Sequence, residues 1–203
     1  FNTQEIRAIF TLPFKLDNRF LLNELETILF PCVTVEVFGE GEVVEVRCKD
    51  YPSKIPLFTH RDFLDSSGKF HEKIRKRPSI DAMVKKLKNL PKLPYIWGGT
   101  FPEGVSELFE LFKPERELNG WEWQLFHLRG IDCSGLLYNV THGTVPRNTG
   151  PLFEICTPIE APSRPLDLIF SPGHVLIYLG DNEVIESVKT HGLRRMDLDN
   201  RLE

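Results

Sequence analysis

Three apolar runs near the carboxyl end restrict the fold of this chain more than any other feature of its sequence. They are LDLIF at 166–170, HVLIYLG at 174–180 and EVIESV at 183–188, and only SPG and the pair Asp181-Asn182 separate them. Connections this short are typical of neighbouring antiparallel strands, and a two-residue connection is typical of a hairpin. We therefore predict a tight antiparallel meander.

Two helices are predicted ahead of this meander. One begins near residue 131, before the loop VPRNTGP. The other covers IDAMVKKLKNL (80–90), where apolar residues recur on one face, Ser79 can cap the amino end and Pro91 stops the helix. A helix followed by antiparallel strands indicates an α+β fold for this half of the chain.

The amino-terminal part has the pattern of a small all-β unit. Residues 20–64 contain four short runs in which apolar and polar residues tend to alternate, and GEG at 39–41 supplies a turn. Short strands at such close spacing predict a small barrel, completed by an aromatic strand near Phe58 and Phe63. The predicted strands are ETILF (26–30), CVTVEVFG (32–39), GEVVEVRC (41–48) and IPLFTHRDFL (55–64).

The segment 102–129 lies between the two predicted helices. It is rich in aromatic and charged residues, and it is interrupted around Pro114 and at the pair Asn119-Gly120. We predict that it is an insertion rather than a core element.

Composition excludes several classes of protein. The chain has 203 residues, of which 41% are hydrophobic, and its formal charge of −4 includes no long basic block, so we expect no nucleic-acid partner. No run approaches the roughly 20 apolar residues that a membrane span needs, and FNTQEIRAIF (1–10) lacks the pattern of a signal peptide. We expect a cytoplasmic location, or a periplasmic one if a signal segment preceded residue 1.

The cysteines bear on metal and disulfide chemistry. Cys32, Cys48, Cys133 and Cys156 contain no CxxC pair, which argues against a structural zinc site and against a disulfide framework. A bridge between Cys32 and Cys48 stays open if the compartment is oxidising. We expect no metal and no other cofactor.

The stretch GIDCSGLLYNV (130–140) places Cys133 where a helix would begin. A cysteine is nucleophilic as the thiolate, which the amino terminus of a helix favours. A buried structural cysteine is the alternative. A nucleophile would need a base from elsewhere in the fold, because Cys–His pairs are neighbours in space and not in sequence.

His174 is the best candidate for that base among the six histidines. It stands at the start of an apolar strand, after a proline and a glycine, although a polar strand-end residue would look the same. The other five are interpreted as surface or packing residues: His60, His71, His127, His142 and His191.

A catalytic imidazole also needs a third group that orients it. Regular pairing outward from the Asp181-Asn182 turn places Glu186 opposite Ile177, short of His174. Contact between Glu186 and His174 therefore requires a bulge, strand coiling or another register.

Four motifs occur in order within residues 80–195. They are YIWGG (95–99), DCSGL (132–136), VPRNT (145–149) and DLIFSPGHVLIYLGDNEVIES (167–187). Together they resemble the NlpC-type bacterial cell-wall peptidases, which are papain-like cysteine enzymes. The resemblance implies that Cys133 is the nucleophile and His174 the general base. The third polar residue of the family is usually His, Asn or Gln, whereas its position here holds Glu186, and His191 is the fallback.

The spacing of the first motif departs from the family. Its aromatic residue usually lies close before the nucleophile, but here the 102–129 segment separates Tyr95 from Cys133. We expect this insertion to loop out over or beside the cleft. By the resemblance, Tyr95 still binds the oxyanion or the substrate through its hydroxyl, and Trp97 either binds substrate or packs in the core.

The predicted barrel is similar to the bacterial SH3-like domains that accompany these peptidases. We therefore place an SH3-like domain at 1–68 and an NlpC-type catalytic domain at 69–203. In the members that recycle wall fragments, such a domain closes one end of the cleft. There, the Asp before the nucleophile helps to hold the free amino terminus of L-Ala-γ-D-Glu-diaminopimelate, and Asp132 and Ser134 match these positions.

The resemblance implies a cysteine endopeptidase that cleaves the γ-D-Glu to diaminopimelate amide in short peptidoglycan fragments, acting as a monomer. Arg147 of VPRNT is assigned to substrate or oxyanion binding, and Tyr51 with the acidic residues near it to amine binding. Two alternatives remain open. One is a thiol amidase or acyltransferase with another substrate, and the other is a catalytically weak protein that binds peptidoglycan peptides.

Overall fold

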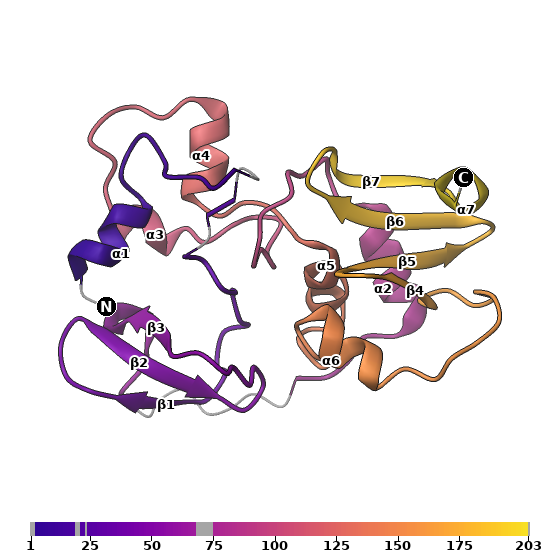
Figure 1. Ribbon diagram of the computed structural model, residues 1–203, viewed down its shortest axis with the longest axis horizontal. Coiled ribbons are helices and arrows are strands. Elements are labelled where there is room, and N and C mark those ends of the chain that lie inside the picture. Colours follow the sequence, from indigo (N-terminus) through magenta and orange to yellow (C-terminus); the bar gives the residue numbers. More distant parts are fainter. Residues whose placement is uncertain (1–2, 19–20, 23, 68–74, 203) are drawn as a thin grey trace.

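The computed structural model describes residues 3–18, 21–22, 24–67 and 75–202, and it confirms the α+β class (Figure 1). The helices are α1 (Thr3–Ile9), the 3-10 helix η1 (Arg61–Phe63), α2 (Ile80–Lys88), α3 (Glu107–Leu111), α4 (Gly120–Phe126), α5 (Cys133–Val140), α6 (Thr149–Glu154) and α7 (Leu198–Leu202). The strands are β1 (Val35–Phe38), β2 (Val43–Cys48), β3 (Leu57–His60), β4 (Leu168–Ser171), β5 (His174–Gly180), β6 (Glu183–Val188) and β7 (Gly192–Asp197).

The carboxyl-terminal sheet has the strand order β4-β5-β6-β7, with every neighbouring pair antiparallel, which confirms the predicted meander. Asp181 (φ 51°) and Asn182 (φ 60°) adopt the left-handed backbone that a two-residue hairpin turn requires, and Asp and Asn tolerate it well. Strand β7 was not predicted, because GLRRMD carries two adjacent arginines and little apolar alternation.

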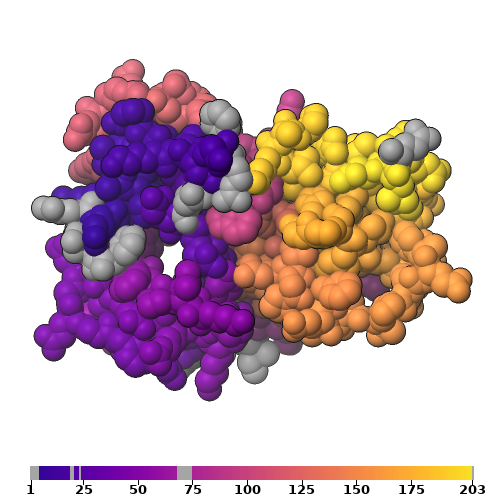
Figure 2. Space-filling model, viewed as in Figure 1, coloured from indigo at the N-terminus to yellow at the C-terminus, as the bar shows by residue number. Residues whose placement is uncertain are grey.

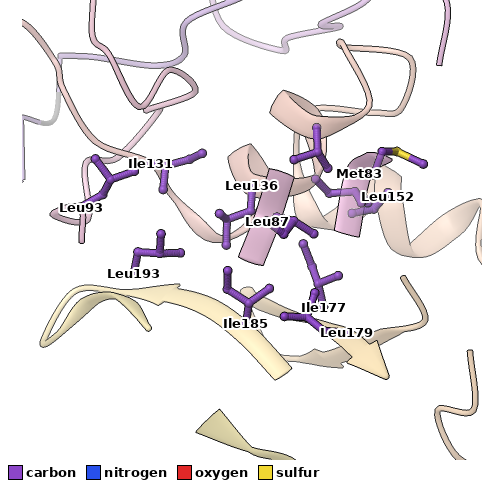
Figure 3. Close-up of a cluster of buried hydrophobic side chains, with 12 residues drawn as sticks. Met83, Leu87, Leu93, Ile131, Leu136, Leu152, Ile177, Leu179, Ile185 and Leu193 are labelled. Carbon is purple, nitrogen blue, oxygen red and sulfur yellow. The ribbon is translucent and has the colours of Figure 1, made fainter. Parts of the chain in front are cut away.

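The larger core lies between this sheet and the helices α2 and α5 (Figure 3). All eight residues of α5 are buried, as expected of a helix that is apolar on most sides. Leu136 of α5 belongs to the same buried cluster as Leu87 of α2, Ile177 of β5 and Ile185 of β6. Ser79 caps the start of α2 as predicted. The core thus fixes the helix that begins with the cysteine against the strands that follow it.

The amino-terminal half contains a three-stranded sheet with the order β1-β2-β3. The predicted strand at 26–30 is wrong, since these residues form no strand. The strand predicted at 55–64 is confirmed as β3 but ends at His60, because Phe63 belongs to η1. The backbone of 26–30 binds a distant loop instead: the Ile28 N–H donates to the Gly98 carbonyl at 3.0 Å. Thr100 Oγ1 donates to the Ile28 carbonyl at 2.7 Å. The SH3-like assignment and its domain boundary stay predictions.

The 102–129 segment holds α3 and α4, which lie beside α1 in Figure 1. The prediction that it contributes no core is wrong, because its apolar residues lack a clear period yet enclose a second core together with the amino-terminal segment. Phe10 stacks on Phe112 with 5.0 Å between ring centroids. The buried members of this second core are Ile6, Leu22, Ile96, Leu108, Phe112, Leu125, Phe126 and Leu128.

Figure 2 shows the two halves side by side, the amino-terminal one in indigo and purple and the carboxyl-terminal one in orange and yellow. Over the ranges that the structure describes, no helix has the length and hydropathy needed to cross a bilayer. Cys32 and Cys48, whose pairing the sequence left open, are free thiols.

Candidate active site

Cys133 is the first residue of α5. Asp132 caps the helix, and its Oδ1 accepts a hydrogen bond from the Gly135 N–H at 2.7 Å. The N–H groups of a first helical turn have no partner within the helix and favour an anion beside them. The Cys133 side chain is largely buried, and its Sγ lies 3.9 Å from Thr149 Oγ1 at the start of α6. This is a suitable position for a nucleophilic thiol.

His174 begins β5 and connects the cysteine to Glu186. Its Nε2 lies 2.6 Å from Glu186 Oε2, and its imidazole is near enough to Cys133 for the two groups to affect each other's protonation. Since Nε2 of His174 faces the carboxylate of Glu186, Nδ1 is the ring nitrogen that can exchange a proton with the thiol of Cys133. The interactions with Cys133 and with Glu186 raise the pKa of His174 to about 9, although burial acts to lower it. The imidazole is therefore protonated at neutral pH.

A β-bulge in β5, just before Gly180, brings Glu186 to His174. Regular pairing would place Glu186 opposite Ile177 and, because side chains alternate along a strand, on the other face from His174. The observed register pairs Ile177 with Ile185 instead. Glu186 thus shares the face of His174. The bulge is one of the three devices that the sequence left open.

Glu186 is completely buried and binds three side chains. While Oε2 faces His174, Oε1 accepts hydrogen bonds from Arg194 Nε and Nη2 at 2.8 and 2.6 Å and from Arg201 Nε at 2.8 Å. Burial alone would raise the pKa of Glu186, but the bonds from His174, Arg201 and Arg194 outweigh it and lower the pKa to about 2. The sequence identified Glu186 but gave no signal for the two arginines.

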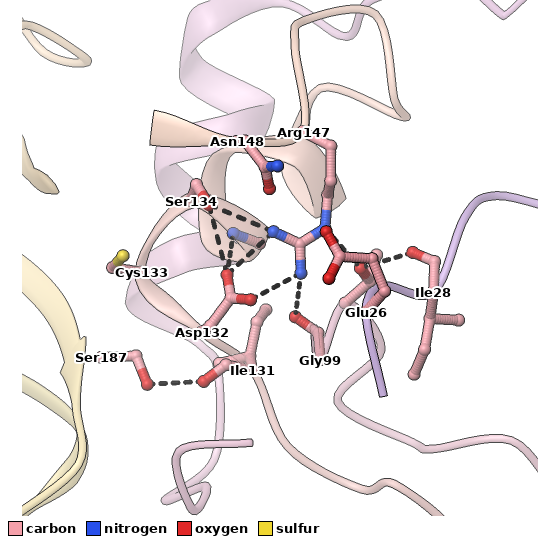
Figure 4. Close-up of polar contacts among 12 residues, drawn as sticks. Glu26, Ile28, Gly99, Ile131, Asp132, Cys133, Ser134, Arg147, Asn148 and Ser187 are labelled. Atoms are coloured by element: carbon pink, nitrogen blue, oxygen red, sulfur yellow. Dashed lines mark hydrogen bonds and ion pairs between the residues drawn. The ribbon is translucent and has the colours of Figure 1, made fainter. Parts of the chain in front are cut away.

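Arg147 lies beside the start of α5, and all five of its N–H groups are used within the protein (Figure 4). Nε donates to Thr100 Oγ1. Nη1 donates to Asp132 Oδ1 and to Ser134 Oγ, and Nη2 donates to Asp132 Oδ2 and to the Gly99 carbonyl. All five distances lie between 2.7 and 3.1 Å. No N–H is left for a ligand, so this geometry does not support the predicted role of Arg147 in substrate or oxyanion binding. It holds the cysteine loop in place.

Asp132 and Ser134, which the resemblance assigned to a substrate amine, belong to the same network. Ser134 Oγ lies 3.4 Å from Asp132 Oδ1, and both oxygens of Asp132 bind Arg147. Arg147 is 2% exposed, so the charge of Asp132 is matched by a buried cation. In the structure these residues support the nucleophile, and an amine would have to compete with the guanidinium.

The YIWGG loop lies against the start of α5. The Asp132 N–H donates to the Gly99 carbonyl at 3.2 Å. The approach is so close that a Cβ on Gly135 would lie 2.3 Å from the Gly99 oxygen. The loop carries Tyr95, which is half-buried, and Trp97, which is 43% exposed. Core packing, one of the two interpretations of Trp97, is thereby excluded.

The amino-terminal half contributes a second polar group next to this network. The Tyr51 hydroxyl donates to the Glu26 carboxylate and accepts a hydrogen bond from Asn148 Nδ2 at 2.8 Å. Burial, followed by the bond to Glu26, raises the pKa of Tyr51 to about 12, so the hydroxyl is neutral. Tyr51 was a candidate from sequence, whereas Glu26 was missed, because it lies in a run that was interpreted as a strand.

The other histidines lie apart from the Cys133–His174 pair or outside the described residues. His191, the fallback for the third catalytic position, is exposed in the β6–β7 turn, with Nδ1 2.7 Å from Thr190 Oγ1. His60 packs edge-on against Phe112, His127 stacks on Phe109, His142 is exposed, and His71 falls outside the described residues.

A cysteine at a helix amino terminus, beside a His–carboxylate pair on the adjacent antiparallel sheet, is an arrangement suited to nucleophilic thiol chemistry. No protein-family model matches the chain, and no curated protein matches it. Two solved structures are similar. A protein of the NlpC/P60 family from Bacillus cereus is 17% identical with a TM-score of 0.51, over 86% of this chain and 77% of that one. The P60 domain of an antigen from M. avium subspecies paratuberculosis is 27% identical with a TM-score of 0.42, over 58% of this chain and 84% of that one. The chain has the NlpC/P60 fold.

Proposed function

We propose that this protein is a cysteine peptidase that hydrolyses the γ-D-Glu to diaminopimelate amide of peptidoglycan stem peptides. The observations that carry the proposal are the position of Cys133 at the start of α5, the pKa of His174, which Cys133 and Glu186 raise together, and the 2.6 Å contact between His174 and Glu186. The NlpC/P60 fold and the motif resemblance favour a cell-wall peptide as substrate.

The proposed chemistry uses Cys133 as the nucleophile and the protonated imidazole of His174 as the acid. The Cys133 thiolate attacks the amide carbonyl carbon, and the protonated His174 gives its proton to the departing amine of diaminopimelate. A water molecule then attacks the thioester, His174 takes up its proton, and the sulfur leaves as thiolate. Glu186 holds the imidazole in the required orientation and stabilises its charged form.

The oxyanion formed in each step needs hydrogen-bond donors. The N–H of Cys133 is one candidate, and the hydroxyl of Tyr95, on the loop bound to the start of α5, is the other. One such donor is typically worth about 3 kcal/mol of the activation barrier.

Short fragments with a free amino-terminal L-Ala are the proposed substrates. A free amine needs an anionic partner, and Arg147 already matches the charge of Asp132. The carboxylate of Glu26 accepts a hydrogen bond from the Tyr51 hydroxyl, and that hydroxyl also accepts one from Asn148, the residue directly after Arg147. We therefore assign the amine to Glu26 and Tyr51, with Asp132 in a supporting role. In that arrangement the amine site of the amino-terminal half lies at a fixed distance from Cys133, so it selects peptides by the number of residues between the free amine and the scissile bond.

The test is mass spectrometry of L-Ala-γ-D-Glu-diaminopimelate incubated with the native protein and with Cys133→Ala. Free diaminopimelate and L-Ala-D-Glu from the native protein alone are expected. The same peptide acetylated on L-Ala is the matched substrate, and it should be cleaved at least tenfold more slowly. An intact tripeptide in both incubations would overturn the proposal. Peptide binding without turnover would then indicate a binding protein, and cleavage of other acyl substrates an amidase or acyltransferase.

A further inference from the structure

Arg194 and Arg201 bind the buried carboxylate from two different elements. Arg194 is the direct cross-strand neighbour of Glu186 in the β6–β7 ladder, whereas Arg201 comes from α7. The two arginine side chains are 30% and 31% exposed, while that of Glu186 is fully buried. Both cations therefore extend inward from the surface to one oxygen of a group that water does not reach.

The β5–β6 turn holds α7 in the position that this contact requires. Asn182 Nδ2 donates to Asp197 Oδ1 at 2.5 Å and to Asp199 Oδ2 at 2.9 Å. The Leu198 N–H donates to the Asn182 carbonyl at 2.7 Å. These bonds fix the start of the helix, and with it the approach of Arg201 to Glu186.

The charges around Glu186 explain why two cations matter. A buried carboxylate on its own would bind the imidazolium of His174 strongly and oppose the loss of its proton. Two guanidinium groups on Oε1 offset part of that negative charge and leave Oε2 for His174. Glu183, the other acid of β6, is already matched by Lys88 and Arg195.

We infer that Arg194 and Arg201 are positioning residues of the catalytic base. The two arginines hold Oε1 of Glu186, so that Oε2 can orient His174. They also offset the charge of the carboxylate, which limits the rise in the pKa of His174 and lets the imidazole give its proton to the leaving amine. The inference rests on the proposed hydrolase function. It gives α7, which carries Arg201, a part in positioning the catalytic base.

The test is an NMR titration of the His174 ring in the full chain, with its resonance identified from the spectrum of His174→Gln. In Arg201→Gln and in Arg194→Gln the remaining arginine still holds Glu186 ionised, so the loss of one cation raises the pKa of His174, by about 0.5 to 1 pH unit. Arg201→Lys keeps the charge and should restore the native titration. Arg195→Gln is the matched control, because it removes an adjacent cation of β7 that binds Glu183 instead.

An unchanged or lowered pKa of His174 in both folded Gln variants would overturn the inference and make the arginines structural only. If Arg201→Gln does not fold, Arg194→Gln and Arg201→Lys decide the question. The titration needs no substrate, so its failure is distinguishable from a failure of the proposed hydrolase function. In an active protein, the alkaline limb of the kcat profile moves to higher pH by the same amount, whereas a folding defect lowers kcat equally at every pH.

Discussion

The imidazole of His174 and the carboxylate of Glu186 meet at 2.6 Å because β5 contains one residue more than a regular hairpin would need. The bulge before Gly180 changes which face of the sheet the residues of β6 occupy, since side chains alternate along a strand. Without it Ile185 and Glu186 would exchange faces, and an apolar side chain would take the place of the carboxylate. The contact between His174 and Glu186 thus depends on the backbone as much as on the side chains.

Replacing Glu186 by Gln should lower the pKa of His174 from about 9 toward its ordinary range, because the imidazolium loses its anionic partner. Two arginines would also lose their buried counter-ion, so we expect the free energy of unfolding to fall by about 3 to 5 kcal/mol. An NMR titration and urea unfolding measure the two effects. Glu183→Gln, on the same strand but partly exposed, should change stability by no more than about 1 kcal/mol. Equal behaviour of the two variants would contradict the role of Glu186.

The stability of the protein should be highest between about pH 4.5 and 6.5. The pKa of Glu186 is lowered to about 2 from 4.5, so its contribution is present above pH 4.5 and lost as the pH falls toward 2. The pKa of His174 is raised to about 9 from 6.5, so its contribution is complete below pH 6.5 and lost as the pH rises toward 9. Thermal unfolding across this range checks both limbs. His174→Gln should flatten the alkaline limb, and a limb that persists in this variant would have another origin.

The elements of the carboxyl-terminal half could be predicted because their signals are local. The apolar runs and the Asp181-Asn182 turn specify the meander, and Ser79 and Pro91 mark the ends of the α2 region. Cys133 and His174 each stand at the start of such an element. These positions were therefore recognisable from sequence.

The remaining features depend on contacts between distant parts of the chain. Nothing near Glu26 indicates that its segment binds the loop at 98–100 rather than a neighbouring strand. Arg201 looks like a solvated residue of a chain end until α7 folds onto the β5–β6 turn. The apolar residues of 102–129 become a core only when the amino-terminal segment covers them. Pairings of this kind are set by tertiary packing, which a sequence pattern does not encode locally.

Replacing Arg147 by Met should lower the free energy of unfolding by about 3 to 5 kcal/mol, because it leaves the carboxylate of Asp132 buried without its cation. Arg147→Lys should recover only part of this loss, since an ammonium group cannot make the five hydrogen bonds of the guanidinium. Urea unfolding measures the change. The control is Arg47→Met, which removes an exposed ion pair with Glu45 and should cost at most about 1 kcal/mol. A similarly small effect at Arg147 would show that the buried network is dispensable.

Replacing Gly135 by Ala tests whether the YIWGG loop must touch α5 for the site to work. The new Cβ would lie 2.3 Å from the Gly99 carbonyl oxygen, which is backbone and cannot rotate away, so the loop must move. We expect a loss of about 1 to 3 kcal/mol in stability and at least a tenfold loss in kcat for the tripeptide. Gly150→Ala is the matched control, because nothing lies within 4 Å of its Cβ in α6, and there alanine should be neutral or stabilising by up to about 1 kcal/mol. Unfolding curves and initial rates for both variants decide the matter. Full activity in Gly135→Ala would mean that the loop carrying Tyr95 and Trp97 can shift without disturbing the oxyanion site.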